Sequence, residues 1–343
     1  MIQEEHFQDF KQGKRIGLFT LRNPNGMIAQ ITNYGAKIVS LYAPDKDGKL
    51  ADVVLGFSTL KEWQEKETYF NAVIGRYANR IKDGRFELDG KQYQLAVNNG
   101  TNHLHGGNIG FNEKVWEVVG QTKHSVSLHY RSKDGEENYP GNLDVYVTYN
   151  LTLDNALEIS YEAKTDKPTI VGFTNHAYFN LKGEGEGDVR DHVLQVFADE
   201  YTPFDNTACP TGEIAPVDNT PMDFREPQII GSRIDDPFFA PGRGIDNNFV
   251  LHKSEGKKKP ELAAIVSADG RTMEVWTTMP GLQVYTGNWI EKNMGKSGRE
   301  YDAQTAVCLE AQNFPNSPNI ASFPSPVLRP GEIYFHQCVY RFV

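Results

Sequence analysis

Short runs of alternating apolar and polar residues recur along most of the chain. In residues 155–166, for example, Leu157, Ile159, Tyr161 and Ala163 occupy every second position, which is the period of a strand with one buried face. Turn sequences such as NPNG, DKDGK and DG separate the runs, so the pattern predicts antiparallel hairpins. Other runs of this kind lie at residues 17–57, 84–95, 114–132, 143–151, 193–204, 263–287 and 332–342.

Helical periodicity is convincing only at residues 58–67. There Ser58 is a candidate N-cap for a short helix that carries Leu60 and Trp63. Many short strands without intervening helices predict an all-β protein, a large antiparallel β-sandwich with few short helices. No linker rich in proline, glycine or serine interrupts the pattern, and no repeat is visible. We therefore expect one domain spanning residues 1–343.

Composition narrows the classes of partner and compartment. The chain has 35 basic and 45 acidic residues among 343, a formal net charge of -10. Nucleic acids and anionic membranes select for basic patches, so neither is expected as a partner. The sequence shows no apolar run of membrane-spanning length and no signal peptide. We expect a cytoplasmic protein, and a mature exported form with its signal removed would have the same appearance.

Cysteine usage agrees with a reducing compartment. The three cysteines are too few and too scattered for a disulfide framework or a zinc ribbon. They are Cys209, Cys308 and Cys338. As core residues they need no function.

The stretch FTNHAYFNL, residues 173–181, places a histidine and two amides between two predicted strands. A buried imidazole without hydrogen-bond partners destabilises the fold. Asn175 and Asn180 could satisfy His176 structurally, and a single buried histidine is more often a core residue than a functional one. The alternative is that His176 points into a polar pocket.

Two further stretches carry groups suited to a ligand rich in hydroxyls. Asn79 and Arg80, in IGRYANRIKDGRF, offer amide and guanidinium donors at the start of a strand. In NNGTNHLHGG, His103 and His105 would share one face of an extended segment, and the glycines that follow let the backbone approach a ligand. A pair of histidines on a strand also begins a metal site of the β-barrel type, which would need further ligands.

Two more candidates lie on predicted strands in the C-terminal half. Asp246, in GRGIDNNFVL, lies just before an apolar run, where a predicted strand begins. Gln283 lies in the middle of WTTMPGLQVYTGNW, an aromatic strand whose Trp276 and Tyr285 could form a stacking wall for a sugar ring.

Glu310 is the sharpest anomaly in the sequence. The predicted apolar strand at residues 306–309 is followed directly by this carboxylate, at a position where the pattern predicts a core residue. A buried glutamate is costly unless it is paired, and desolvation raises its pKa toward the range useful to a general base.

Six motifs resemble, in the same order, those of the aldose 1-epimerases, also called galactose mutarotases. They are NRI, NHLHGG, FTNHAYFNL, GIDNNFVL, GLQVYTGNW and LEAQNFPNSPN, and the resemblance extends from about residue 33 to the C-terminal strand. It implies the large antiparallel β-sandwich of that family, an open sugar-binding cleft, and neither a cofactor nor a metal. It also implies a small-molecule sugar as the partner of a monomer or homodimer in galactose and hexose metabolism. One departure is Asn316, where the motif often has aspartate, and this difference bears on the loop alone.

The resemblance assigns three residues to acid-base catalysis and four to holding the sugar hydroxyls. They are His176 as general acid, Glu310 as general base and His105 near the ring oxygen, with Asn79, Arg80, Asp246 and Gln283 as substrate-binding residues. An aldohexose changes anomer by opening its hemiacetal, which needs one group to take a proton and another, on the opposite side of the ring, to deliver one. A bell-shaped pH dependence is expected, with Glu310 ionised and a histidine protonated.

Three alternatives lead to different chemistry. A metal enzyme would use His103, His105, His176 and Glu310 as ligands. A non-catalytic sugar-binding module needs aromatic and polar groups but has no use for a buried glutamate opposite a histidine. A relative acting on hexose 6-phosphates needs a basic cluster for the phosphate, and no such cluster stands among the motifs.

Overall fold

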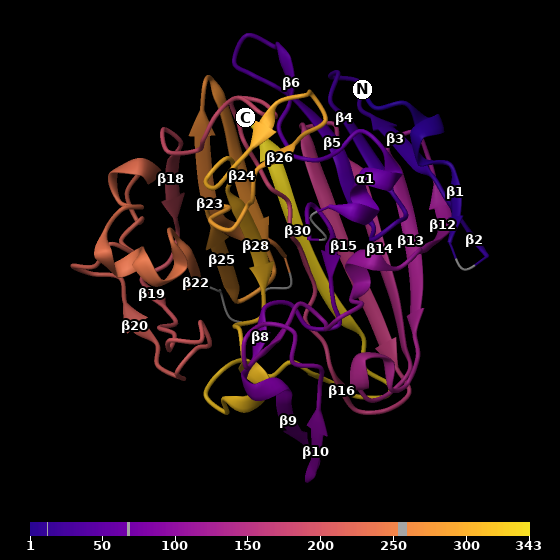
Figure 1. Cartoon of the computed structure of the whole chain (residues 1–343), viewed down its shortest axis with the longest axis vertical. Helices are drawn as coiled ribbons and strands as arrows, with labels where there is room; N and C mark the ends of the chain where they lie inside the picture. The colour runs from indigo at the N-terminus through magenta and orange to yellow at the C-terminus, as the bar shows by residue number, and fades with distance from the viewer. Residues whose placement is uncertain (12, 67–68, 253–258) are drawn as a thin grey trace.

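The computed structural model describes residues 1–11, 13–66, 69–252 and 259–343 (Figure 1). Three sheets of nine, five and four strands contain most of its regular structure, and neighbouring strands pair antiparallel. The expected all-β architecture is therefore confirmed. The last residue of the predicted helix, Glu67, lies outside the described residues.

The nine-stranded sheet runs through the whole molecule, and its long central strands pair along most of their length. In spatial order its strands are β12 (Glu117–Gln121), β13 (Ser125–Ser132), β14 (Leu143–Leu151), β15 (Ala156–Thr165), β30 (Tyr334–Phe342), β24 (Arg271–Thr277), β23 (Glu261–Ala268), β18 (Val193–Val196) and β21 (Gln228–Ile229).

The two smaller sheets are built from different parts of the chain. The five-stranded sheet consists of β20 (Ala215–Pro216), β19 (Glu200–Tyr201), β22 (Asp246–Val250), β25 (Gly281–Tyr285) and β28 (Cys308–Gln312). The four-stranded sheet is N-terminal and consists of β3 (Leu18–Arg22), β4 (Ile28–Thr32), β5 (Lys37–Pro44) and β6 (Leu50–Asp52).

Six two-stranded pairs and a few short helices complete the described structure. The pairs are β1 (Asp9–Lys11) with β2 (Lys14–Ile16), β7 (Val73–Ile74) with β17 (Thr174–Asn175), β8 (Arg80–Ile81) with β11 (His103–Leu104), β9 (Arg85–Leu88) with β10 (Lys91–Gln94), β16 (Thr169–Ile170) with β29 (Val327–Leu328), and β26 (Asn293–Met294) with β27 (Glu300–Tyr301). The helices are α1 (Leu60–Glu65) and the 3-10 turns Glu4–Phe7, Lys82–Gly84, Phe111–Glu113, Glu136–Asn138, Ile230–Ser232, Pro237–Gly242 and Ser317–Asn319. Across the described ranges, no helix is long and apolar enough to cross a membrane.

One shared core explains how the three sheets hold together. On β15, Leu157, Ile159 and Tyr161 are buried while the residues between them are partly exposed, as the alternation predicts. The same hydrophobic cluster includes Leu41 from the four-stranded sheet and Leu282 from the five-stranded sheet. Burial of each large aliphatic side chain contributes about 1.5–3 kcal/mol.

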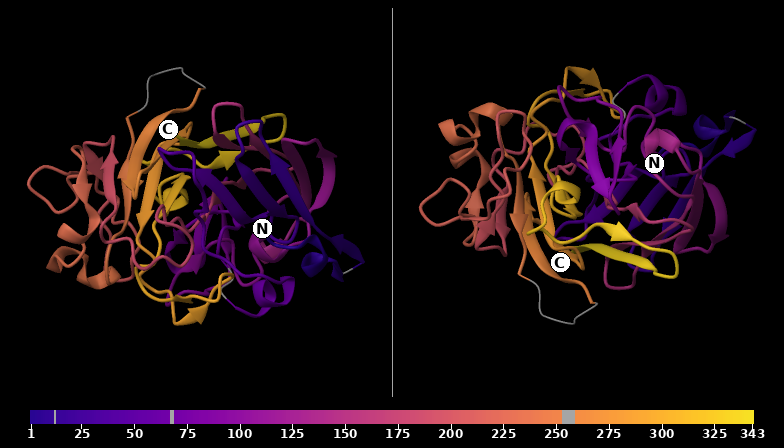
Figure 2. Two further views of the ribbon diagram at one scale, coloured as in Figure 1. Left: turned by 90° about the horizontal axis from the view of Figure 1, so that it is seen from above. Right: turned by 90° about the horizontal axis from the view of Figure 1, so that it is seen from below.

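Seen from above and below, the loops near residues 200–245 lie on one flank and the N-terminal strands on the other (Figure 2).

The helix α1 begins one residue later than its predicted cap. Thr59, not Ser58, is the N-cap, because its hydroxyl accepts the backbone N–H of Glu62 at 3.3 Å. The Glu62 carboxylate accepts the backbone N–H of Thr59 at 3.0 Å in return, which completes a capping box. Leu60 and Trp63 are buried as expected.

Candidate active site

One face of the five-stranded sheet carries a row of polar side chains. Gln283 on β25 lies directly opposite Glu310 on β28 and Asn248 on β22, and Asp246 lies two positions before Asn248. Because side chains two apart on a strand point to the same face, these four groups line one side of three adjacent strands. Leu282 and its neighbours on the other face belong to the hydrophobic core.

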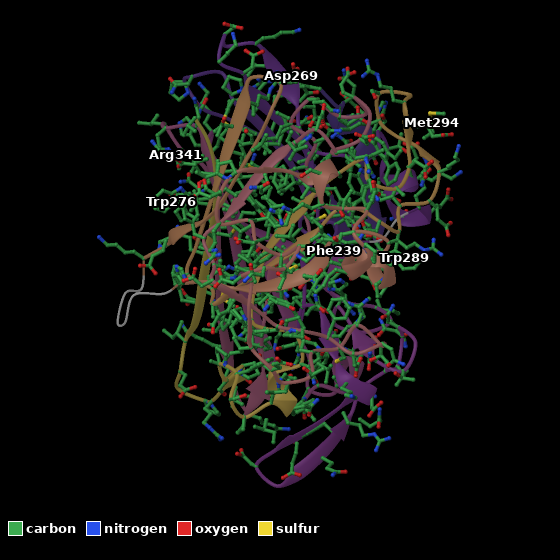
Figure 3. The ribbon with its side chains drawn as sticks, turned by 90° about the vertical axis from the view of Figure 1, so that its left-hand side faces the viewer. Phe239, Asp269, Trp276, Trp289, Met294 and Arg341 are labelled. Carbon is green, nitrogen blue, oxygen red and sulfur yellow. The ribbon has the colours of Figure 1, made fainter. Side chains whose placement is uncertain are left out.

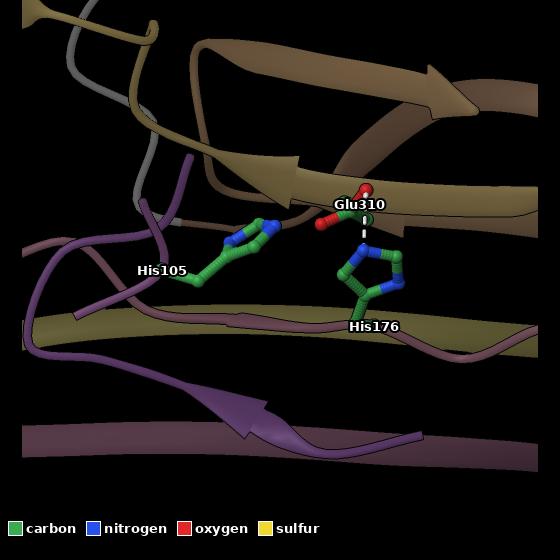
Figure 4. A group of neighbouring side chains, drawn as sticks. All are labelled: His105, His176 and Glu310. Carbon is green, nitrogen blue, oxygen red and sulfur yellow. Dashed lines mark ion pairs between the residues drawn. The ribbon is translucent and has the colours of Figure 1, made fainter. Parts of the chain in front are cut away.

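Two histidines from distant parts of the chain meet this row. His176 follows β17, which pairs with β7, and His105 follows β11, which pairs with β8. Nε2 of His176 lies 3.6 Å from Oε1 of Glu310 (Figure 4). One ring nitrogen of each histidine and a carboxylate oxygen of Glu310 all lie within 4.8 Å of one another. The three residues that the sequence singles out as acid-base groups therefore form one cluster.

An open cleft of about 660 Å³ lies over the cluster, and most of the predicted site residues lie on its wall. Those on the wall are Asn79, Arg80, His105, His176, Asp246 and Glu310. Gln283 is buried behind the wall, where its amide donates to Asp246 Oδ1 at 2.7 Å. Gln283 thus orients Asp246, and its own contact with a sugar stays a prediction.

Hydrogen bonds fix Arg80 at the cleft wall before any ligand arrives. Its backbone N–H donates to Asn79 Oδ1 at 2.8 Å, and its Nε donates to Asn99 Oδ1 at 3.1 Å. Asn316, where the related motif often has aspartate, accepts the Lys82 N–H and donates its own N–H to the Arg80 carbonyl at 2.7 Å. A guanidinium positioned in advance loses less freedom when it binds a sugar.

The backbone of Asn79 sets the tautomer of His105. The Asn79 N–H donates to Nδ1 of His105 at 3.1 Å, and Asn79 adopts φ 63°, in the left-handed region that asparagine tolerates. A nitrogen that accepts this bond carries no proton, so the proton of the neutral ring lies on Nε2. Binding a metal through Nε2 would require removal of that proton. The hydrogen bond therefore argues against the metal alternative and makes His105 a hydrogen-bond donor.

His103 takes a structural role, and the expected shared face with His105 does not form. The strand β11 ends at Leu104, and His105 has φ 52°, which turns the chain away from an extended path. The ring of His103 bonds the Ala96 carbonyl at 2.8 Å and the Tyr139 hydroxyl at 2.6 Å. Both nitrogens of His103 are therefore occupied by the protein itself.

Burial sets the protonation of the cluster. Desolvation, assisted by the charge of Asp246 and opposed by that of Arg80, raises the pKa of Glu310 well above 4.5. Desolvation lowers the pKa of His176 from 6.5 to about 3 and that of His105 well below 6.5. Between the two pKa values the pair of Glu310 and His176 holds one proton, and that proton resides on Glu310.

These pKa shifts exchange the groups that set the two limbs of the pH profile. The sequence led us to expect Glu310 on the acid limb and a histidine on the basic limb. The other one-proton form, with an ionised Glu310 and a protonated His176, is the one that the expected roles of base and acid require. Moving that proton across 3.6 Å converts one form into the other without exchange with solvent. The acid limb then reports the lowered pKa of His176 and the basic limb the raised pKa of Glu310.

The aromatic wall differs from the expected one. Tyr285 lines the cleft, but the second aromatic residue is Trp289, half-exposed, whose backbone N–H donates to the Tyr285 hydroxyl at 2.9 Å. Trp276 lies on β24 in the nine-stranded sheet and, in Figure 3, near Arg341 on the side of the molecule away from Trp289. The prediction for Trp276 was wrong because residues 263–287 form strands of two different sheets.

Two tyrosines pack against His176 and His105. The ring of Tyr178 stacks on His176 with centroids 4.9 Å apart and an interplanar angle of 11°. Tyr69 lies 4.9 Å from the ring of His105 and also lines the cleft. Tyr178 belongs to a motif visible in the sequence, whereas no local pattern marks Tyr69.

Comparisons of the sequence and of the structure with known proteins agree on one family. The sequence model described as aldose 1-epimerase matches residues 17–341. Galactose mutarotase of Mus musculus is 44% identical over 334 residues, which cover 96% of this chain and 95% of the relative. Aldose 1-epimerase of Escherichia coli (strain K12) is 39% identical over 336 residues, 96% of each chain. The crystal structure of an aldose epimerase homologue from C. elegans superposes with a TM-score of 0.88 at 34% identity and covers 96% of this chain and 99% of the homologue.

Proposed function

The chain belongs to the aldose 1-epimerase family, and we propose that it interconverts the α and β anomers of free aldohexoses such as glucose and galactose through His176, Glu310 and His105. It is thus an isomerase. The observation that carries the residue assignment is the 3.6 Å contact between the buried Glu310 carboxyl and the His176 imidazole on the wall of an open cleft. A protein that only holds sugars has no need of such a pair, because gripping hydroxyls involves no proton transfer.

Ring opening moves two protons at neighbouring oxygens. Glu310 takes the proton of the C1 hydroxyl while His176 gives a proton to the ring oxygen. The bond between C1 and the ring oxygen breaks, and O1 becomes the carbonyl oxygen of the open aldehyde. Each proton-transfer group of this kind contributes roughly 10²- to 10⁴-fold to the rate.

Ring closure after rotation about the C1–C2 bond yields the other anomer. His176, now neutral, takes back the proton of the C5 hydroxyl as its oxygen attacks the opposite face of C1. Protonated Glu310 returns a proton to O1. The two side chains end in the protonation states in which they began, so no external proton carrier is needed.

The contact between acid and base fits this reaction better than groups on opposite sides of the ring, the arrangement expected from the sequence. O1 and the ring oxygen are both bonded to C1, so two groups that lie side by side, as Glu310 and His176 do at 3.6 Å, can serve both oxygens. His105 keeps its Nε2 proton and would donate it in a hydrogen bond to the ring oxygen as charge develops there.

The remaining wall residues suit a free sugar. Arg80 and Asn79 offer donors, and Asp246, oriented by Gln283, offers acceptors for hydroxyl groups. Arg80 is the one lysine or arginine among the described lining residues. A sugar phosphate would need a cluster of such groups, which supports free aldohexoses over hexose 6-phosphates.

We also propose a single domain over residues 1–343, which acts as a monomer or homodimer in the cytoplasm and binds neither nucleic acid nor membranes. The shared core of the three sheets supports one domain. The net charge of -10 disfavours polyanionic partners. All three cysteines are buried thiols, which agrees with a reducing compartment.

Glu310→Gln and His176→Asn should each lower the rate of anomer interconversion at least about 10²-fold, because each removes one proton-transfer partner. Polarimetry on freshly dissolved α-D-glucose and α-D-galactose measures this rate directly, and circular dichroism verifies the fold. Near wild-type rates in either folded variant would refute the assigned role. A wild-type protein that does not accelerate the optical change would refute the function itself.

His105→Ala should lose most of the activity, whereas His103→Ala should lose little activity even if it unfolds at a lower temperature. The reason is that His105 faces the cleft, while both nitrogens of His103 bond the protein. Chelator should change neither the wild type nor the variants. Equal, large losses at both positions, together with restoration of chelated wild type by added zinc, would instead favour a metal enzyme.

The profile of kcat/KM against pH should stay level through pH 4.5 on its acid side, because His176 titrates at about 3. Its basic limb should shift in opposite directions in two variants. Asp246→Asn removes a charge that raises the pKa of Glu310 and should move this limb to lower pH. Arg80→Gln removes a charge that lowers that pKa and should move the limb to higher pH.

Polarimetry between pH 4 and pH 10 measures these shifts, and the rates of both variants are expected to fall overall because both groups also bind sugar. An acid limb near 4.5 combined with a basic limb near 6.5 would mean that Glu310 and His176 keep their ordinary pKa values. That result would contradict the placement of the shared proton on Glu310.

A further inference from the structure

We propose that Asn71 is the positioning residue of His176, an inference that rests on the proposed function. Asn71 is fully buried and does not line the cleft. Its backbone has φ 55°, in the left-handed region. It lies two residues before β7, the strand that pairs with the segment leading into His176.

The side chain of Asn71 joins three separate segments. Its Nδ2 donates to the carbonyls of Ile38 at 2.8 Å and Leu55 at 2.6 Å, and its Oδ1 accepts the backbone N–H of Tyr178 at 2.9 Å. An asparagine amide supplies two donors and an acceptor in this geometry and tolerates a positive φ. Aspartate lacks the donors, and alanine lacks all three bonds.

The main chain around Asn71 clamps His176 on both sides. The Asn71 N–H donates to the His176 carbonyl at 2.9 Å, and the His176 N–H donates to the Ala72 carbonyl at 3.0 Å. The amide of Asn175 adds a bond to the Asn71 carbonyl at 3.2 Å. Both peptide groups that flank the catalytic imidazole are therefore held by residues 71 and 72.

This clamp matters because the imidazole itself makes few hydrogen bonds. Within the described part of the chain, no hydrogen bond reaches Nδ1 of His176. The ring is placed by its own backbone, by the stacked ring of Tyr178, and by edge contacts with His105 and Tyr285. Asn71 bonds the backbone of both residues, so it controls the position of the imidazole and of the ring that supports it. The distance from His176 to Glu310 follows from that position.

A matched pair of variants separates positioning from general stability. Asn71→Gly keeps the left-handed backbone and removes the three side-chain bonds. Asn33→Gly is the control: Asn33 is also buried, accepts the Gly17 N–H at 2.9 Å, and donates to the carbonyls of Arg15 and Trp116 at 2.9 and 2.8 Å, away from the cleft. Both variants lose two donated bonds and one accepted bond.

The expected result is a split between kcat and KM. Asn71→Gly should lower kcat at least about 10-fold with the KM for galactose within about 2-fold of wild type, because small misplacements of a catalytic group slow the chemical step. Asn33→Gly should lower the melting temperature by a similar amount and leave kcat unchanged. Unchanged kcat in folded Asn71→Gly would overturn the proposal, as would an equal loss of kcat in both variants.

A second variant covers the case in which Asn71→Gly does not fold. Asn71→Asp keeps the shape and the bond from Tyr178, and a protonated carboxyl regains one donated bond. Its deficit in kcat relative to wild type should narrow as the pH falls, and a constant deficit would overturn the proposal. Wild-type protein assayed in parallel distinguishes failure of the proposed function from failure of the role of Asn71. An inactive wild type would refute the proposed function and, with it, the role of Asn71. An active wild type would confine the failure to Asn71.

Discussion

The proposed chemistry of this protein depends on a carboxylic acid that is kept out of water. Glu310 is 2% exposed, and desolvation disfavours its charged form. The same desolvation disfavours a charge on His176, which lies 3.6 Å away. Because the two groups respond to burial in opposite directions, together they retain one proton over a wide range of pH. In the proposed reaction, that proton passes between them when a sugar hydroxyl needs a base and a ring oxygen needs an acid.

The rest of the fold holds this pair in place. Glu310 lies on a strand whose other face is packed into the core shared by the sheets, so its backbone cannot shift without disturbing that core. The chain from Asn71 to Asn79 holds both histidines. Its first residue bonds the backbone of His176, and its last residue bonds a ring nitrogen of His105. Both asparagines adopt positive φ, which allows their N–H groups to point at these partners.

The sequence predicted what depends on local pattern and missed what depends on tertiary context. Alternation predicted the strands, and Glu310 stood out because it interrupts an apolar run. The turn at His105 was not foreseen, because a positive φ in a non-glycine residue has no signal in residue order. Trp276 was misassigned because the sheet to which a strand belongs is a property of the whole fold. Gln283 is bonded to Asp246, a partner that residue order does not reveal, and its contact with the sugar stays a prediction.

Nitrogen-15 NMR of histidine-labelled protein tests the central claim most directly, because it reports which ring nitrogens carry protons. At pH 7 the account predicts a neutral His176 and a neutral His105 whose proton lies on Nε2. The signals of His105→Ala and His176→Asn assign the two rings, and His176 should remain neutral as the pH is lowered through 6.5. A His176 ring protonated on both nitrogens at pH 7 would contradict the placement of the shared proton on Glu310.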